Sequence, residues 1–256
     1  MSVIQCTGFK KTPDQNIKIK ATWLGNTKTV VKQFLVSFLS YLKYPFSKKK
    51  DGAAKKYFAS IYDQSIKDDL IFDGHSSSYL EKVKLVVPIN SRFDCIYDCG
   101  CGEASFLNFI KQNMWQYNRY IGIDYAIQPC EINSREKLVK SDIVDYEFQT
   151  NSENSLFVFA NVFCYMSDTN IINILNKINT LHSNILIVDP IPGLFWDATF
   201  AGVRLFYRSR NRVDKLLSSM GFVRKTTAID YFIKKNNFFV LPLSYATYYE
   251  FKGRDE

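Results

Sequence analysis

Histidine is almost absent from this chain of 256 residues. Only His75 and His182 are present, whereas there are six cysteines. Zinc sites built on cysteine need a full set of cysteine or histidine ligands at matching spacing, and no histidine pair accompanies these cysteines. We therefore interpret the cysteines as small, half-buried thiols and expect no structural metal.

We also expect no cleavable secretion signal. The first 16 residues are polar and lack the apolar core that a cleavable signal requires. Internal repeats and long low-complexity segments are absent too, and 46% of the residues are hydrophobic, enough for the packed core of one sizeable domain. We expect a folded protein in the reducing cytoplasm.

Positive charge is concentrated at one end of the sequence. The formal net charge is +8, yet residues 1–56 contain twelve lysines and only two aspartates, which leaves the rest of the chain slightly acidic. A broad nucleic-acid groove over the main domain would need a basic surface. The charge distribution therefore argues against a nucleic-acid partner.

The basic segment, residues 1–56, is predicted to hold a short strand at 17–24 and an amphipathic helix within 30–46. Lysine clusters follow the helix at 48–50 and 55–56. Two interpretations stay open. The helix covers the ligand cleft of the main domain, or residues 29–56 dock peripherally on an anionic membrane surface, where so short and lysine-rich a helix would lie flat.

The main domain is expected to span residues 57–256, with cap helices at 57–92 and a core at 93–251. In the core, apolar strand patterns alternate with helical patterns, and two successive strands end the chain. The expected strands are 93–97, 119–124, 137–141, 156–160, 185–189, 222–229 and 238–251; the expected helices are 105–114, 169–181 and 211–220. This order predicts an α/β fold with a Rossmann-like, doubly wound, mostly parallel sheet of seven strands and an antiparallel edge hairpin.

The most informative segment of the core is a glycine turn. The apolar strand that ends at Asp98 continues into Cys99-Gly100-Cys101-Gly102 and then into a helix, and Asp124 closes the next strand, 22 positions after Gly102. Closely spaced glycines expose backbone N–H groups beside the positive end of a helix. An acid at the next strand tip can accept both hydroxyls of a ribose. The pattern predicts a nucleotide-like ligand across two adjacent strand tips.

These residues resemble the class I S-adenosylmethionine-dependent methyltransferases over 93–251. Asp98-Cys99-Gly100-Cys101-Gly102 is similar to the first motif of that family, and Ile121-Gly122-Ile123-Asp124 is similar to the second. Lys140-Ser141-Asp142-Ile143 resembles the motif at the adenine edge, and 156–165 with Ser167-Asp168 resembles the fourth-strand segment. The terminal hairpin after Gly221-Phe222 resembles the reversed strand that closes the sheet of the family.

The resemblance implies S-adenosyl-L-methionine as cofactor and assigns roles to single residues. The methionine end would meet Asp98 and the backbone of Gly100, Cys101 and Gly102. The ribose hydroxyls would bind Asp124, with Tyr125 beside it. The adenine would contact Asp142 and Ile143, and Asn161 would border the methionine moiety.

One position departs from the family pattern, because Ala104 stands where a third glycine is usual. Alanine is still small enough for a helix and a strand to approach. Nicotinamide enzymes use a similar turn, but their pyrophosphate favours a third glycine and would be repelled by a carboxylate at Asp98. That carboxylate would instead attract the ammonium group of a methionine, which favours the methyltransferase interpretation.

The residues that would bind the methyl acceptor are harder to predict from the sequence. Candidate catalytic residues are His75, in a polar loop where the resemblance places a lid, and Tyr165 and Asp189, near strand tips. The segment 190–207 combines aromatic residues with a charged side chain that could hold a polar group of the substrate. Its candidates for substrate binding are Trp196, Arg204 and Tyr207.

We expect a methyltransferase that acts on an oxygen or nitrogen atom of a small molecule. Three alternatives stay open. The first is an enzyme at a membrane surface that methylates a lipid or lipid-linked glycan, and the second is a noncatalytic subunit that binds the cofactor. The third, a nucleic-acid methyltransferase using the lysine clusters, would show steeply salt-dependent binding.

Overall fold

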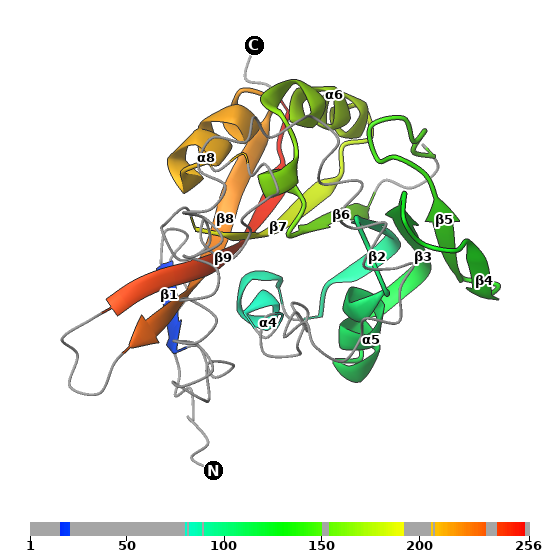
Figure 1. Cartoon of the computed structure of the whole chain (residues 1–256), viewed down its shortest axis with the longest axis horizontal. Helices are drawn as coiled ribbons and strands as arrows, with labels where there is room; N and C mark the ends of the chain where they lie inside the picture. Colours follow the sequence, from blue (N-terminus) through cyan, green and yellow to red (C-terminus); the bar gives the residue numbers. More distant parts are fainter. Residues whose placement is uncertain are drawn as a thin grey trace, which may run out of the picture.

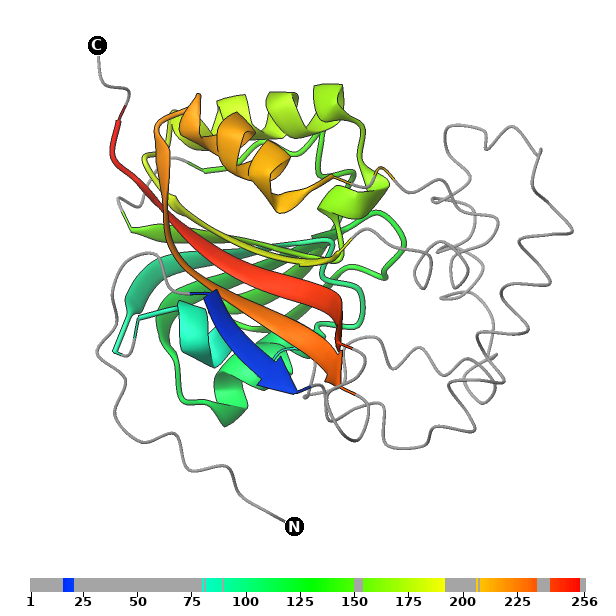
Figure 2. The same ribbon diagram turned by 90° about the vertical axis from the view of Figure 1, so that its left-hand side faces the viewer.

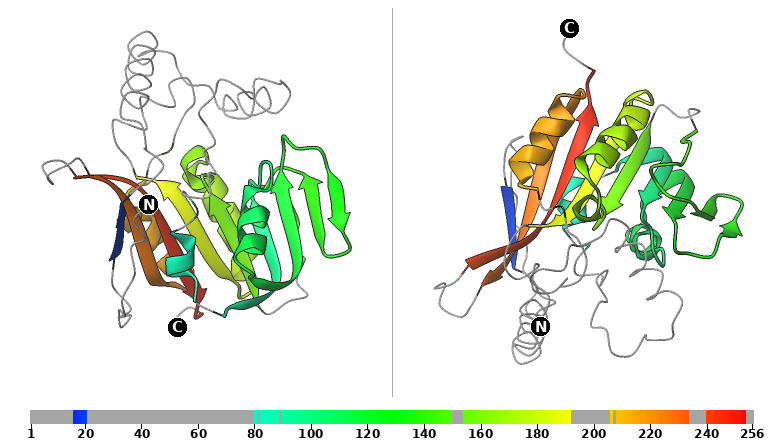
Figure 3. Two further views of the ribbon diagram at one scale, coloured as in Figure 1. Left: turned by 90° about the horizontal axis from the view of Figure 1, so that it is seen from below. Right: turned by 45° about the horizontal axis from the view of Figure 1, so that its top comes forward.

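One twisted sheet organises the part of the chain that the computed structural model describes, namely residues 16–20, 80, 82–88, 90–149, 154–191, 206, 208–233 and 240–253. Within those residues the sheet has nine strands in the order β1-β8-β9-β7-β6-β2-β3-β5-β4. Figure 3 shows this order across the sheet, from β1 at one edge to β4 at the other.

Five parallel strands form the centre of the sheet. They are β2 (Arg92–Cys99), β3 (Gln116–Asp124), β5 (Glu136–Lys140), β6 (Ser155–Ala160) and β7 (Asn184–Pro190). The long hairpin of β8 (Phe222–Ile233) and β9 (Val240–Phe251) follows, with β9 antiparallel to both β7 and β8. The seven expected strands and the antiparallel hairpin are therefore confirmed.

Two further strands make the sheet wider than the predicted seven. β1 (Asn16–Lys20) pairs in parallel with β8, and β4 (Cys130–Asn133) pairs antiparallel with β5. A strand near the N-terminus was expected, but its partner on the far edge of the sheet could not be read from local sequence. β4 was missed because all four of its residues are exposed and carry no alternating apolar signal.

Helices cover both faces of the sheet, as a doubly wound fold requires. α4 (Val83–Val86) and α5 (Ser105–Gln112) lie on one face, and α6 (Asp168–Asn179) and α8 (Arg210–Ser218) lie on the other (Figures 1 and 2). α6 shows why these segments are helical. Ser167 caps its first turn by accepting from the backbone N–H of Asn170, and its apolar residues recur at helical spacing and are buried, namely Ile171, Ile174, Leu175 and Ile178.

The central strands are buried on both faces. Every residue of β6 is buried, and its side chains alternate between the two apolar clusters, Phe157 and Phe159 packing beneath α6 and Leu156 and Val158 beneath α5. A parallel strand covered on both sides reads as one continuous apolar run, which is why β6 was easy to find in the sequence.

Several expected features lie outside the described residues. These are the helix within 30–46, the membrane-docking candidate 29–56 and most of the cap 57–92, of which Leu80 and α4 belong to the described part. No helix in the described ranges is long and apolar enough to cross a membrane.

Candidate functional site

The glycine turn connects β2 to α5 at the carboxyl end of the sheet. Gly100 and Gly102 both have positive φ angles, +81° and +49°, a region that glycine occupies without steric cost. The N–H groups of Gly100 and Cys101 donate to the carbonyl oxygen of Ile123 at 2.7 and 3.2 Å. The turn is thus tied to the end of β3, the strand whose tip carries Asp124.

Ala104 also adopts a left-handed conformation, with φ of 59°, immediately before α5. Its small side chain is buried. This is the position where the related motif usually has a third glycine, and the positive φ gives a physical reason for that preference. Alanine fits here at a conformational cost of about 1–2 kcal/mol.

Gly100 also allows close contact between the turn and the segment after β6. A Cβ atom placed on Gly100 would lie 2.5 Å from Cγ2 of Val162. Real Cβ atoms do not come so close to other carbon atoms. The absence of a side chain at Gly100 therefore lets Val162, in the segment after β6, pack directly against the turn.

Asp98 is 1% exposed and lies on the last part of β2. The hydroxyl of Tyr120 on β3 donates to Asp98 Oδ2 at 2.5 Å. Burial raises the pKa of Asp98 to about 7; the hydrogen bond from Tyr120 opposes this rise, and the nearby charge of Asp124 adds to it. Tyr120 was not singled out from sequence, where it reads as one more apolar strand residue.

Asp124 is oriented by the backbone around it. Its Oδ2 accepts from the N–H of Gly102 at 3.1 Å, and its Oδ1 accepts from the N–H of Ala126 at 2.8 Å. Burial raises the pKa of this carboxyl, while the two backbone hydrogen bonds hold it down. The acid at the tip of β3 and the glycine turn thus form one hydrogen-bonded unit.

The tip of β5 lies beside the tip of β3. The N–H of Ser141 donates to the carbonyl of Asp124 at 3.1 Å, and Asp142 Oδ1 accepts from the N–H of Val144 at 3.1 Å. Ile143 is buried and Tyr125 is half-buried. All predicted cofactor residues from β2, β3 and β5 therefore come together at one end of the sheet.

Asn161 follows β6 at the same end. It has a positive φ of 58°, and its N–H donates to the carbonyl of Val188 on β7 at 2.7 Å. Next comes a short 3₁₀ helix, η1 (Phe163–Tyr165), which holds the half-buried Tyr165. The structure thus places Asn161 beside the glycine turn, through its neighbour Val162, and Tyr165 in the short helix that follows.

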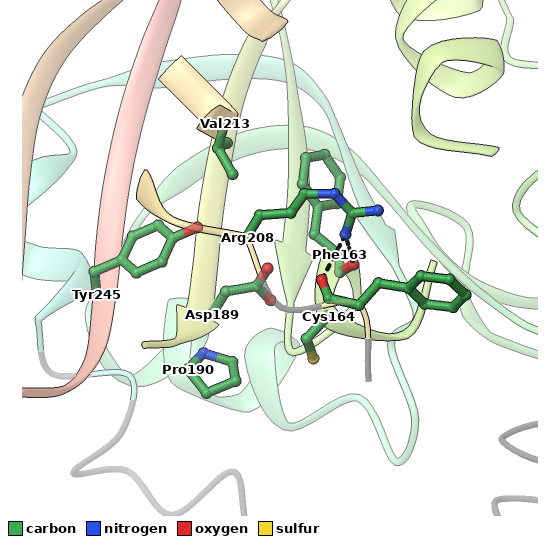
Figure 4. Close-up of a pocket in the computed structure, with 8 residues that line it drawn as sticks. Phe163, Cys164, Asp189, Pro190, Arg208, Val213 and Tyr245 are labelled. Atoms are coloured by element: carbon green, nitrogen blue, oxygen red, sulfur yellow. Dashed lines mark hydrogen bonds between the residues drawn. The ribbon is translucent and has the colours of Figure 1, made fainter. Parts of the chain in front are cut away.

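Asp189 lines a small cavity at the tip of β7 (Figure 4). It pairs in register with Tyr245 on β9, and the two side chains point toward one another. Burial raises the pKa of this carboxyl well above its usual value, while the charge of Arg208 and a hydrogen bond from the N–H of Val162 oppose the rise. Among the described residues nothing hydrogen-bonds to Asp189 Oδ1. The cavity of about 10 Å³ suits one water-sized polar group.

Arg208 borders the same cavity and was missed by sequence reasoning. Its guanidinium donates to the carbonyls of Phe163 and Phe206, both at 2.8 Å (Figure 4). It also donates to Asp168 Oδ1 at 2.5 Å and to the carbonyl of Met166 at 2.6 Å. It thereby ties η1 and the start of α6 to the segment that precedes α8. No local pattern could have revealed this, because three of the four acceptors are backbone carbonyls.

Four candidates lie outside the described residues, namely His75, Trp196, Arg204 and Tyr207. Among the residues that are described, no group of three or more histidine, cysteine, aspartate or glutamate side chains is placed to hold a metal ion.

No protein-family model matches the chain, and no curated protein matches it either. Several solved structures do match the chain. The chain is similar to mitomycin 7-O-methyltransferase (12% identity, TM-score 0.57, covering 91% of this chain and 75% of that one) and to N,N-8-amino-8-demethyl-D-riboflavin dimethyltransferase from Streptomyces davawensis (13%, 0.54, 87% and 69%). It is also similar to an S-adenosylmethionine-dependent methyltransferase from Archaeoglobus fulgidus (15%, 0.50, 68% and 92%). These likenesses confirm the expected class I methyltransferase fold.

The glycine turn gives a stability prediction. Gly100→Ala should lower the free energy of unfolding by about 2–4 kcal/mol, because it adds a disfavoured positive φ to a clash with Val162. Gly253→Ala is the matched control, since Gly253 has φ of +86° but a Cβ atom placed on it would have no other atom within 4 Å. It should cost only about 1–2 kcal/mol. Equal losses in urea unfolding would show that the contact with Val162 is not restrictive.

Asp98 gives a pH prediction. Between about pH 4, where an unfolded aspartate titrates, and about pH 7, the folded chain retains a proton that the unfolded chain has released. The contribution of Asp98 to stability is therefore full below this window and falls as the pH rises through it. Unfolding measured at several pH values should show this loss in the wild-type chain relative to Asp98→Asn. Parallel curves for the two chains would contradict the raised pKa.

Proposed function

We propose that this protein is an S-adenosylmethionine-dependent methyltransferase that acts on an oxygen or nitrogen atom of a small molecule. The observation that carries the proposal is the hydrogen-bonded unit of the glycine turn and Asp124. It fixes a carboxylate at the tip of β3 beside a glycine turn whose backbone a ligand can approach closely, which suits a ligand with a ribose and a charged amino-acid end.

Residues at the tips of different strands would bind different parts of the cofactor. Asp124 would accept hydrogen bonds from the ribose hydroxyls, with Tyr125 beside the sugar. Asp142 would accept from the adenine amino group, and the apolar side chain of Ile143 would pack on the ring.

The methionine end would lie at Asp98, Gly100, Cys101 and Gly102, bordered by Asn161. An ammonium group there favours the ionised form of Asp98 and would lower the pKa of that carboxyl from about 7. Cofactor binding should therefore release a proton near neutral pH.

When bound, S-adenosylmethionine would supply a methyl group attached to a positively charged sulfonium sulfur. The lone pair of the acceptor would bond to the methyl carbon while the carbon–sulfur bond breaks, and the sulfur would leave as a neutral thioether. The protein then has two tasks, to hold the acceptor in line and to exclude water. An amine acceptor must be neutral to react, whereas a hydroxyl acceptor also has to lose its proton.

We assign Asp189 as the general base that would receive the proton of a hydroxyl acceptor. Its Oδ1 is available within the described structure, and the N–H of Val162 reaches its carboxylate while the side chain of Val162 abuts Gly100. Asp189 is thus one residue away from the glycine turn. Tyr165 lies on the same side, and His75, Trp196, Arg204 and Tyr207 stay predictions for the acceptor site.

The comparisons support a small-molecule acceptor. The neighbours include enzymes named for O-methylation of mitomycin and for N,N-dimethylation of a riboflavin derivative. A cytoplasmic location is part of the proposal, and the free thiols of Cys95, Cys99, Cys101, Cys130 and Cys164 are consistent with a reducing compartment. Membrane docking by residues 29–56 stays an alternative that vesicle co-sedimentation can test.

Cofactor binding tests the proposal first. Calorimetry should detect S-adenosylmethionine binding to the full chain, and Asp124→Ala should weaken it by about 10- to 100-fold because two hydrogen bonds to the ribose are lost. Asp145→Ala is the control, since Asp145 is exposed and close to the same strand tips. A folded parent chain that does not bind the cofactor would refute the proposal.

The role of Asp189 is tested with acceptors. In a screen of hydroxy- and amino-aromatic compounds, turnover is measured as formation of S-adenosylhomocysteine. Asp189→Asn should lower kcat for a hydroxyl acceptor by about 10²–10⁴-fold, while the affinity for S-adenosylmethionine stays within about threefold of the parent. A variant with unchanged kcat would remove Asp189 from the mechanism without affecting the cofactor assignment.

A further inference from the structure

A second hollow lies at the opposite end of the sheet from the glycine turn. It has a volume of about 490 Å³, within the range of small-molecule sites. Arg92 begins β2 and contributes to its wall, together with residues at the start of β3, the end of α5 and the turn between β4 and β5. Because β2 and β3 are parallel, this rim is separated from the candidate cofactor site by the length of both strands.

The lining of the hollow carries positive charge and no acid. Its charged residues are Arg92, Lys111 and Arg135. The charge of Lys111 is compensated, because its Nζ lies 2.6 Å from the buried Glu136. Neither arginine forms an ion pair with any residue that the structure describes. Two uncompensated guanidinium groups therefore face one hollow, on a main domain that is slightly acidic as a whole.

The backbone that presents the two arginines is fixed. The carbonyl oxygen of Arg135 accepts a hydrogen bond from the backbone N–H of Tyr120 at 2.8 Å. The backbone N–H of Arg135 donates to Asn133 Oδ1 at 2.9 Å. Arg92 pairs with Gln116 in the sheet, and its carbonyl accepts from Asn154 Nδ2 at 2.5 Å. The backbone positions from which the two arginine side chains extend are thus set before any ligand arrives.

Aromatic side chains complete the wall. Trp115 packs against three phenylalanines, Phe93, Phe106 and Phe109, with ring centroids 5.9–6.2 Å apart, yet it is only half-buried. Tyr117 is held by its hydroxyl, which donates to Glu136 Oε1 at 2.7 Å. Met114 on the rim is 87% exposed, an apolar side chain that a ligand could cover.

We propose that this hollow binds a small molecule in which a phosphate group is attached to a flat aromatic ring. A phosphate monoester carries a charge of about −1.5 to −2 at neutral pH, which matches the two uncompensated arginines, and guanidinium groups bind its oxygens in a fork geometry. The ring lies against Trp115 and Tyr117. This site is independent of the proposed methyl transfer.

Phenyl phosphate is the probe, titrated into the full chain at constant ionic strength and followed by calorimetry and by tryptophan fluorescence. Arg92→Gln and Arg135→Gln should each weaken its binding by at least about fivefold. Lys215→Gln should not, because Lys215 is an exposed lysine on α8, on the other face of the sheet. Phenol, which lacks the charge, and inorganic phosphate, which lacks the ring, should both bind more weakly than phenyl phosphate.

Two results would overturn the proposal. One is the absence of saturable binding of phenyl phosphate to the parent chain, and the other is equal affinity in the arginine variants and Lys215→Gln. Inorganic phosphate binding as tightly as phenyl phosphate would overturn the assignment of a ring-bearing ligand. Thermal unfolding confirms that the variants are folded, and S-adenosylmethionine binding, unchanged in all of them, separates this outcome from that of the cofactor site.

Discussion

The hydrogen bonds from Gly100 and Cys101 to the carbonyl of Ile123 are the interaction on which the candidate site depends. They tie the turn after β2 to the end of β3, and the N–H of Gly102 extends the connection to the Asp124 side chain. Only residues that tolerate positive φ and leave room for Val162 allow this path. The relative positions of the turn, the Asp124 side chain and the segment after β6 depend on these contacts.

Three buried acids surround the turn, and each is stabilised in its own way. Asp98 receives a tyrosine hydroxyl, Asp124 receives two backbone N–H groups, and Asp189 receives one backbone N–H and faces Arg208. Burial raises the pKa of all three carboxyls, at a cost in folding stability, and groups with raised pKa values cluster at functional sites. Their concentration at one end of the sheet is the electrostatic reason to place the chemistry there.

The two ends of the sheet therefore differ in charge. The carboxyl ends of the strands gather acids and backbone N–H groups. At the amino ends of β2 and β3, tryptophan and tyrosine lie beside two arginines that form no ion pair within the described part of the chain. Parallel strands make this separation possible, because residues at the start and end of each strand always fall on opposite rims.

The sequence by itself determined the doubly wound fold, its seven main strands and the set of cofactor candidates. These follow from local causes, namely apolar runs that must be buried, glycines at a sharp turn, and acids at strand tips that a parallel sheet necessarily brings together. Only the tertiary structure decided the partners of those residues. The pairing of β1 with β8, the contact of Tyr120 with Asp98 and the hydrogen bonds of Arg208 to Phe163, Met166 and Asp168 all join positions far apart in the chain. Such contacts leave no local pattern, because they depend on distances that exist only after the sheet has assembled.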